Sequence, residues 1–487
     1  MRKEPARPAD PGAILLLSAY ELGHQPQGLT LPAALLREAG FAPRLLDLST
    51  DRLREDWVRQ ARLVGISAPM HTALVLGVRA AERVRALNPD CHICFYGLYA
   101  TLNQDYLLKR DAPAGLADSV IGGECEPPLL RLAQALTQGS PGRVHDGERL
   151  ELPGVSLPGR PAPPYLARIP WRIPARDGLR PLEQYGRLLL PSEDEVQERV
   201  AGYVEATRGC KHLCLHCPIP PVYGGRFFAV PRALVQEDID HQVRQGARHI
   251  VFGDPDFLNG PGHALAIARG LHTAHPGVTF DFTAKIEHLL RHRDLLPELK
   301  QCGALFVISA VESLSDTVLG HLDKGHTRSD VMEALALLRQ TGLVLSPTFV
   351  PFTPWSELTD YMELLDWVSQ EGLRQQVAPV QLTLRLLVPP GSALIGTPQF
   401  AAVRSRLDQA AFTFRWEHPD PRMDTLHAQA QRLVQQAEQE GWPSERAFAA
   451  LERLAFALTR PDERPRAHPR PALPSLPAPR MKESWFC

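Results

Sequence analysis

The stretch RGCKHLCLHCP, residues 208–218, places three cysteines in the spacing C-x-x-x-C-x-x-C. Cys210, Cys214 and Cys217 fall close together, and no C-x-x-C pair follows them in the chain. Structural zinc is normally enclosed by four ligands, with its cysteines in pairs. Three thiolates suit a [4Fe–4S] cluster in which one iron keeps an open coordination position. The spacing therefore predicts an iron–sulfur cluster that admits a further ligand.

A structural zinc site is the alternative for this loop. His212 or His216 would have to supply the fourth ligand, but each lies so near its neighbouring cysteines that tetrahedral geometry is difficult. The loop also follows a strand-like segment, GYVEATRG, and βα barrels carry their chemistry in loops of this kind. Iron–sulfur ligation is therefore the preferred interpretation.

The bulk composition narrows the class of protein. The chain has 487 residues, enough for about three domains, and 53 basic against 55 acidic side chains. This near balance gives no argument for nucleic acid or a membrane surface as a partner. The longest apolar run, ALFVISAV, is far shorter than the roughly 18 residues of a membrane span. The N-terminus lacks the apolar core of a secretory signal, so we expect a cytoplasmic protein.

Residues 13–140 alternate strand-like and helical segments. The strand candidates AILLLSAY, RLLDLS, RLVGISAP, HICFYG and DSVIGGE are separated by segments such as VLGVRAAERVRAL. This order predicts an α/β domain with a doubly wound, Rossmann-like parallel sheet, preceded by a disordered N-terminus over 1–12. Such sheets bind ligands at the carboxyl ends of their strands, where Ser67, Gly97 and Glu124 lie.

A second βα series follows a proline-rich linker over 141–200. Within 201–398, six strand-like segments with helical segments between them predict a partial (β/α)6 barrel. The cysteine loop, Asp254, Glu287 and Glu312 fall at the carboxyl ends of these strands, where such barrels place their active sites.

The C-terminal part of the chain has a different composition. Residues 399–460 are expected to be mostly helical, as in LHAQAQRLVQQAEQE. Residues 461–487 are proline-rich and too poor in apolar side chains to fold, which predicts a disordered tether ending in MKESWFC.

The cysteine loop and the barrel pattern resemble the radical SAM superfamily, whose hallmark is C-x-x-x-C-x-x-C. In that family the open iron is chelated by S-adenosylmethionine (SAM), and one electron from the cluster cleaves SAM to methionine and a 5′-deoxyadenosyl radical. The resemblance implies a [4Fe–4S] cluster, SAM, and an electron donor such as flavodoxin or ferredoxin.

The resemblance also implies a set of SAM contacts. They are His216, which replaces the usual aromatic residue before the third cysteine, Asp254 and Asp256 in FGDPDF, Glu312 and Ser313 in SAVES, and Lys324 in LDKGHT.

The first domain resembles the cobalamin-binding domain that precedes the barrel in one branch of this superfamily. The segments GISAPMHT, FYGLYAT and VIGGECEPPLLRL carry the resemblance, which implies a cobalamin site at Ser67, Gly97 and Glu124. The motif D-x-H-x-x-G, whose histidine ligates cobalt in other cobalamin domains, is absent from the sequence. His71 is an alternative axial ligand, and a hydrogen-bonded structural histidine is the more common use of such a residue.

The terminal WFC resembles the radical SAM subgroup named for its CUAEP or CCAEP tail. In that subgroup a cysteine precedes selenocysteine or a second cysteine. The resemblance implies a catalytic Cys487 and raises the hypothesis that the sequence stops at a selenocysteine codon; a true terminus with an unused cysteine is the alternative.

These features predict a cobalamin-dependent radical SAM enzyme that methylates an unactivated carbon or phosphorus centre of an unknown small-molecule or peptide substrate. The first alternative is rearrangement, cyclisation or thiol insertion, with cobalamin absent or non-methylating. The second alternative is a noncatalytic metal-cluster scaffold.

Overall fold

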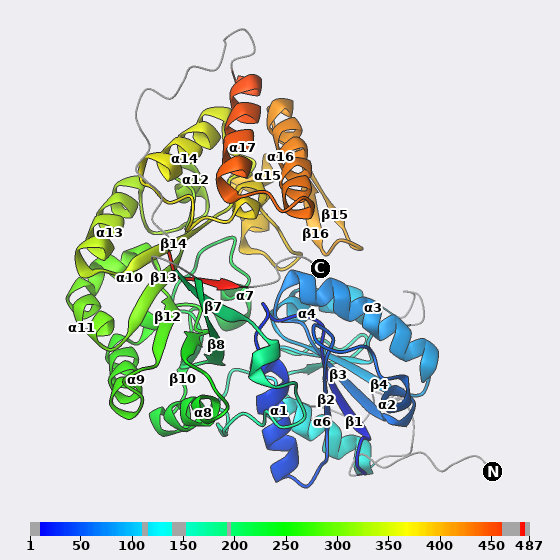
Figure 1. The fold of residues 1–487 in the computed structure, drawn as a ribbon. Coiled ribbons are helices and arrows are strands. Elements are labelled where there is room, and N and C mark those ends of the chain that lie inside the picture. Colours follow the sequence, from blue (N-terminus) through cyan, green and yellow to red (C-terminus); the bar gives the residue numbers. More distant parts are fainter. Residues whose placement is uncertain (1–9, 110–114, 139–151, 192–195, 460–477, 483–487) are drawn as a thin grey trace.

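The structure is a computed structural model with two α/β units and a helical C-terminal region (Figure 1). It describes residues 10–109, 115–138, 152–191, 196–459 and 478–482. Cys487, the predicted catalytic cysteine, lies outside the described residues. None of the helices in these ranges is long and apolar enough to cross a membrane.

The first unit is built on a sheet with the strand order β2-β1-β3-β4-β5-β6. The first five strands are parallel, and β6 pairs antiparallel with β5. The order 2-1-3-4-5 is that of a flavodoxin-like doubly wound sheet, whose ligand crevice lies where β1 and β3 diverge. The strands are β1 Ile14–Ser18, β2 Arg44–Asp47, β3 Leu63–Ser67, β4 His92–Tyr96, β5 Ser119–Ile121 and β6 Val155–Ser156.

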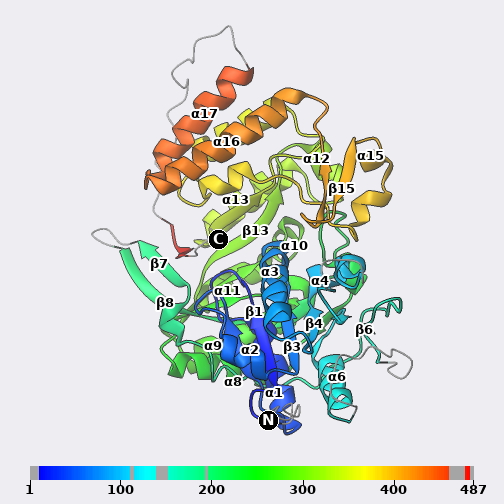
Figure 2. The ribbon, with the colours of Figure 1, turned by 90° about the vertical axis from the view of Figure 1, so that its right-hand side faces the viewer.

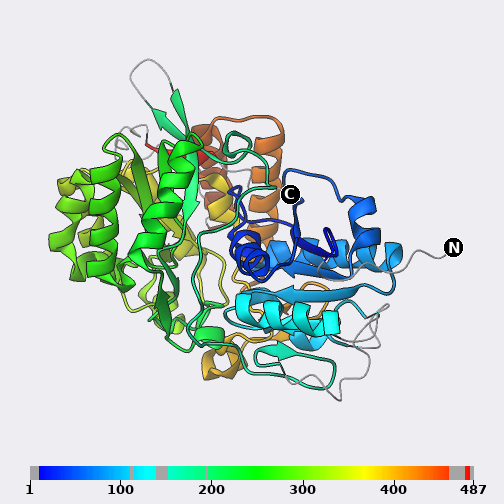
Figure 3. The same cartoon turned by 90° about the horizontal axis from the view of Figure 1, so that it is seen from below.

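Helices cover both faces of this sheet, which explains why its strands read as continuous apolar runs. The helices α1, Gln27–Glu38, and α6, Glu126–Gln138, pack against each other on one face. The other face is covered by α2 Glu55–Gln60, α3 His71–Leu87, α4 Leu98–Leu102 and α5 Gln104–Leu107. Figure 3 shows this unit beside the barrel, with its sheet between the two layers of helices.

The second unit is a curled half-barrel with the strand order β14-β13-β12-β11-β8-β7-β17. Five neighbouring strands are parallel, and β7 and β17 add antiparallel at the β8 edge. The parallel strands are β8 Val196–Val204, β11 His249–Phe252, β12 Thr279–Thr283, β13 Ala304–Glu312 and β14 Val344–Phe349; the other two are β7 Arg187–Pro191 and β17 Arg480–Lys482.

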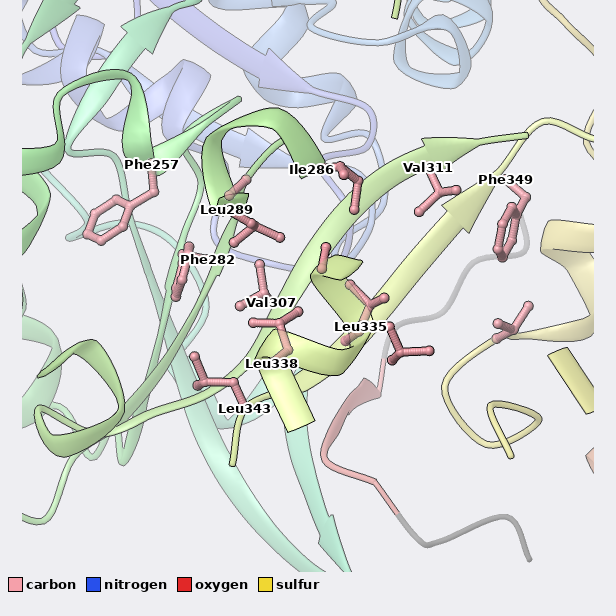
Figure 4. Packing of buried hydrophobic residues seen from close by; sticks show 14 of the residues in the cluster. Phe257, Phe282, Ile286, Leu289, Val307, Val311, Leu335, Leu338, Leu343 and Phe349 are labelled. Carbon is pink, nitrogen blue, oxygen red and sulfur yellow. The ribbon is translucent and has the colours of Figure 1, made fainter. Parts of the chain in front are cut away.

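Helices on the outer side of the half-barrel close its core. Figure 4 shows Phe282 and Val307 from the strands facing Leu289 and Leu338 from the helices, all within one buried cluster. The helices are α8 Arg232–Arg244, α9 Pro261–Ala274, α10 Ile286–Arg291, α11 Leu296–Gln301, α13 Arg328–Thr341 and α14 Leu358–Gln370. Helix α12, Asp316–His321, belongs to a smaller cluster that includes Leu386 and Trp416.

The sixth barrel strand expected from the sequence is reduced to a single bridge. Residues 379–391 begin with a 3-10 helix, Pro379–Thr383, and Arg385 then forms an isolated parallel bridge with Phe352. Proline at the start of the segment favours a helical turn and removes one backbone donor that a strand would need.

The predicted linker and tether both contribute strands. Residues 141–200 include β6, β7 and the first half of β8, so the barrel sheet begins before residue 201. Within 461–487, predicted to be disordered throughout, β17 pairs with β7. Pairing through backbone hydrogen bonds does not require apolar side chains, which explains why composition missed this strand.

The C-terminal region contains the expected helices α16, Pro421–Gln439, and α17, Ser444–Thr459, which pack side by side (Figure 2). It also contains a hairpin that was not expected, formed by β15, Ser405–Asp408, and β16, Thr413–Trp416. The loop of this hairpin reaches the first unit, where Phe412 joins its core.

Candidate functional site

The cysteine loop is held at the carboxyl end of β8. A short strand, β9 (Thr207–Gly209), pairs antiparallel with β10 (Phe227–Ala229) on the far side of the loop. Gly209 has a positive φ of 76°, and a side chain there would collide with the carbonyl of Arg226. The two strands therefore close the loop at its base.

All three cysteines line one cavity of about 280 Å³. Cys210 and Cys214 are buried and Cys217 is partly buried, and none of them forms a disulfide. Burial raises the pKa of the Cys217 thiol to about 12 and also raises that of Cys210. Thiolates at such positions need a bound cation to be stable. Three sulfurs facing one space, with no fourth cysteine among the lining residues, fit a cluster with one open iron.

Neither histidine of the loop completes this set. Nε2 of His216 lies 3.1 Å from Oε1 of Glu312. The ring of His212 faces Asp256, with Nε2 3.5 Å from Oδ2. A zinc site in this loop would need His212 or His216 as its fourth ligand. Both rings face carboxylates instead.

Glu312 and Lys324 form a buried ion pair in the cavity wall. Nζ of Lys324 lies 3.2 Å from Oε1 of Glu312. Although burial opposes ionisation, Lys324 and then His216 hold the pKa of Glu312 well below its usual range. Glu312 has a positive φ of 67°, beside a shift in the register of β13 and β14. This backbone conformation is strained for any residue other than glycine, and such strain is concentrated at functional sites.

The acids after β11 do not line the cavity. Asp254 accepts hydrogen bonds from N of Ala206 (3.0 Å) and Oγ1 of Thr207 (2.5 Å), and burial raises its pKa to about 7. Asp256 caps the turn that follows it by accepting from N of Leu258 at 2.9 Å. These predicted SAM ligands therefore fix loops, and the residue between them, Pro255, is the one that lines the cavity.

Ser313 is also engaged locally, because its Oγ accepts a hydrogen bond from N of Ser315 at 3.0 Å.

The cavity has a further cation that the sequence interpretation did not name. Lys285, at the carboxyl end of β12, lines the cavity with its Nζ 3.1 Å from Nδ1 of His212. The signal for it was its position near the end of the strand-like segment VTFDFTAKIE.

Residues 204–365 match the family described as the Radical SAM superfamily. The chain contains a radical SAM domain. The matched span begins at the end of β8 and includes the cysteine loop, Glu312 and Lys324. The cluster and SAM are the cofactors of this superfamily, and the three cysteines are placed to hold the cluster.

Two curated relatives extend the match beyond the radical SAM domain. The chain is 25% identical to hopanoid C-3 methylase of Methylococcus capsulatus over 347 residues, which cover 70% of this chain and 64% of the relative. It is 24% identical to anaerobic magnesium-protoporphyrin IX monomethyl ester cyclase of Rubrivivax gelatinosus over 329 residues, which cover 65% of this chain and 57% of the relative. The chain thus spans less than two thirds of either relative's length.

Two solved structures share the fold. The cobalamin-dependent SAM radical enzyme OxsB, solved with aqua-cobalamin, matches with a TM-score of 0.67 at 15% identity, over 93% of this chain and 74% of that chain. The radical SAM methyltransferase TsrM from Kitasatospora setae, solved with tryptophan and a SAM analogue, matches with a TM-score of 0.55 at 19% identity, over 73% and 70% of the two chains.

The first unit joins the radical SAM domain through a buried charge network. Nη1 of Arg208 lies 2.5 Å from Oε1 of Glu126 and 3.2 Å from Oε2 of Glu124. Its Nε lies 2.7 Å from Glu205, and Tyr223 donates to Glu124 at 2.9 Å. The predicted cobalamin residue Glu124 therefore has its partners at this interface, where Arg208 lies two residues before Cys210 in the chain.

Ser67 and Gly97 lie at the carboxyl edge of the first sheet. Ser67 is buried and donates to Oε1 of Glu21 at 3.1 Å. Burial raises the pKa of Glu21, whose carboxylate also accepts a hydrogen bond from the backbone N of Gly28, to about 7. Gly97 has a φ of 104°, and a Cβ there would lie 2.9 Å from the backbone of Ala68. Glycine thus allows the loops after β3 and β4 to lie together.

These loops face the cysteine loop. Burial and then the nearby Cys217 raise the pKa of Tyr99, which places this ring close to the cluster site. The neighbouring residues Pro69, Met70 and Leu98 are part-exposed. His71, the alternative axial ligand, has its Nε2 2.8 Å from the carbonyl oxygen of Ala411 in the hairpin loop.

Proposed function

We propose that this protein is a cobalamin-dependent radical SAM enzyme that transfers a methyl group to an unactivated carbon or phosphorus centre of a small-molecule or peptide substrate. The observation that carries the proposal is the convergence of three cysteines, two buried and one partly buried, on one cavity, with the carboxyl edge of the first sheet facing the same loop. When bound, the cluster with SAM supplies a carbon-centred radical, and cobalamin supplies a methyl carrier.

The side chains of the cavity have distinct tasks in this proposal. The three cysteines hold the cluster and leave one iron for SAM. Glu312 accepts from Lys324 and His216 on one oxygen, Oε1, so its other oxygen, Oε2, is available for a polar group of SAM. Lys285 and Lys324 place two cations in the wall of this cavity, where Lys324 is paired with Glu312 and lies close to the cysteines.

The first unit fits a flat ligand at its carboxyl edge. Small and part-exposed residues after β3 and β4 let a ring system approach the backbone, and Gly97 keeps the two loops close. Ser67 and Glu124 lie beneath this surface with other partners, so we assign the contact to the loop residues around Pro69 and Leu98 instead. The fold shared with OxsB supports cobalamin as that ligand.

Anaerobic reconstitution tests the proposal. The full-length protein is loaded with iron and sulfide, desalted with and without hydroxocobalamin, and incubated with SAM and a reductant. We expect about four irons and one cobalamin per chain, and release of 5′-deoxyadenosine. A cluster that forms without SAM cleavage would favour the noncatalytic scaffold, and loss of all cobalamin on desalting would remove the cobalamin part.

A second candidate is radical ring closure or rearrangement, which the likeness to the magnesium-protoporphyrin cyclase favours. Product mass separates the two candidates. With SAM that carries a deuterated methyl group, transfer adds a labelled methyl group to the substrate, whereas ring closure gives an unlabelled isomeric or dehydrogenated product.

A further inference from the structure

Three metal-ligating side chains outside the cysteine set converge beside the cavity. His212 belongs to the cysteine loop, Asp256 to the turn after β11, and His288 to α10. Nδ1 of His288 lies 2.8 Å, and Nε2 of His212 lies 3.5 Å, from the same oxygen, Oδ2 of Asp256. The three ligand atoms all lie within 4.8 Å of one another. Three segments far apart in sequence thus direct one donor atom each to a common point.

Hydrogen bonding does not account for the two imidazole nitrogens. His288 and Asp256 are almost completely buried, at 4% and 0% exposure. Neither Nδ1 of His288 nor Nε2 of His212 has a hydrogen-bond partner of acceptable geometry among the residues that the structure describes. A buried nitrogen without a hydrogen-bond partner destabilises the folded state, so the orientation of these two rings needs a cause.

The spacing of the three atoms suits a metal ion. Ligand atoms about 2.1 Å from a tetrahedral centre lie about 3.4 Å apart. Nδ1 of His288 at 2.8 Å and Nε2 of His212 at 3.5 Å from Oδ2 of Asp256 lie on either side of this value. The two imidazole rings are 4.4 Å apart between centroids and tilted by 56°, so they do not stack on each other.

Outer partners orient two of the ligands. Oδ2 of Asp256 also accepts from the backbone N of Lys285 at 3.3 Å, which fixes the carboxylate. Nδ1 of His212 lies 3.7 Å from Oε2 of Glu287, and metal-bound histidines usually direct their second nitrogen to a carboxylate. Nζ of Lys285 lies 3.6 Å from the same Glu287 oxygen, so Lys285 keeps this partner when Nδ1 of His212 carries the proton.

We propose that His212, Asp256 and His288 bind a divalent transition-metal ion of the zinc or iron(II) class, separate from the iron–sulfur cluster. Two imidazoles and one carboxylate are typical ligands of such ions. Three protein ligands leave a coordination position open, and His212 lines the same cavity as the cysteines. The ion ties the cysteine loop to α10 and offers a Lewis acid at the cavity wall.

Zinc binding to the cluster-loaded, full-length protein tests this site. We expect one zinc per chain beyond the iron of the cluster, with an X-ray absorption spectrum of nitrogen and oxygen ligands. H288Q and D256N weaken zinc binding by about tenfold or more. H292Q is the matched control, because its ring lies 5.5 Å from that of His288 outside the ligand set, and it retains the zinc. Iron(II) added in place of zinc identifies which of the two ions binds more tightly.

Three results would overturn the site. They are no zinc bound by the wild-type protein, sulfur ligands in its zinc spectrum, or unchanged zinc affinity in both H288Q and D256N. Where a variant does not fold, the ligand set in the wild-type spectrum decides. The test does not depend on SAM cleavage or on cobalamin, so it stands apart from the proposed function.

Discussion

Nζ of Lys324 lies 3.2 Å from Oε1 of Glu312, and neither side chain is more than 10% exposed. The pair stands in the wall of the cavity that the three cysteines line. Burial alone would favour neutral forms of both groups, but each stabilises the charge of the other. Lys324 also faces Cys214 and Cys217, so its charge favours the thiolates that a cluster requires.

Removal of Lys324 should destabilise the protein. In K324M the carboxylate of Glu312 keeps only His216 as a partner, and a buried charge that loses its partner costs roughly 3 kcal/mol or more. Thermal unfolding of the anaerobic, cluster-free protein measures the loss. The double variant K324M/E312Q should recover most of it, and a double variant as unstable as the sum of the two single variants would contradict the pairing.

Removal of a cluster cysteine should abolish the cluster. We expect C214A to retain few or none of the roughly four irons per chain and to release no 5′-deoxyadenosine, because two thiolates do not hold a [4Fe–4S] cluster with an open iron. Iron analysis and chromatography of the reaction check this. C302A is the control, since Cys302 is a buried cysteine away from the cavity lining, and equal iron in both variants would refute the assignment.

Glu21 should make the stability of the protein depend on pH. Burial raises its pKa in the folded state from about 4.5 to about 7, so its stabilising effect is complete below about pH 4.5 and is lost as the pH rises through about 7. The difference amounts to about 3 kcal/mol. The midpoint of thermal unfolding should therefore fall less in E21Q than in the wild type between pH 5 and pH 8. E38Q is the control. The hydrogen bond from Arg172 lowers the pKa of Glu38, so E38Q should not reduce the fall of the unfolding midpoint between pH 5 and pH 8.

The junction between the two units should depend on Arg208. R208M leaves the buried acids Glu124 and Glu126 without their cation, which costs roughly 3 kcal/mol or more. Calorimetry should show a lower midpoint and separation into two transitions as the units uncouple. R208M/E124Q/E126Q should restore a single transition. R172M, which breaks an exposed ion pair with Glu38, is the control and should leave the profile unchanged.

Local chemistry made parts of this molecule predictable. The cysteine spacing predicted that Cys210, Cys214 and Cys217 lie together, because these residues are close in sequence, and they line one cavity. The apolar periodicity predicted both sheets. The direction of a side chain at a strand end is not encoded locally. Asp254 and Glu312 both follow barrel strands, yet Asp254 is held by Ala206 and Thr207 whereas Glu312 lines the cavity.

Contacts between distant segments were the least predictable. Glu124 was expected to contact a cofactor, and its actual partners, Arg208 and Tyr223, lie more than 80 residues away in sequence. The convergence of His212, Asp256 and His288 has the same cause, because three separate loops meet only after the barrel has formed.

The strand β17 has a consequence for how the protein behaves in concentrated solution. It pairs with β7, and Nζ of Lys482 lies 2.9 Å from Oε1 of Glu198. Without β17, the backbone donors and acceptors of β7 would form a bare edge, ready to recruit a strand from another molecule. Charged side chains on β17 discourage such recruitment at the new edge. The strand β17 therefore protects the edge of β7 from self-association, and its removal should make the protein prone to precipitate.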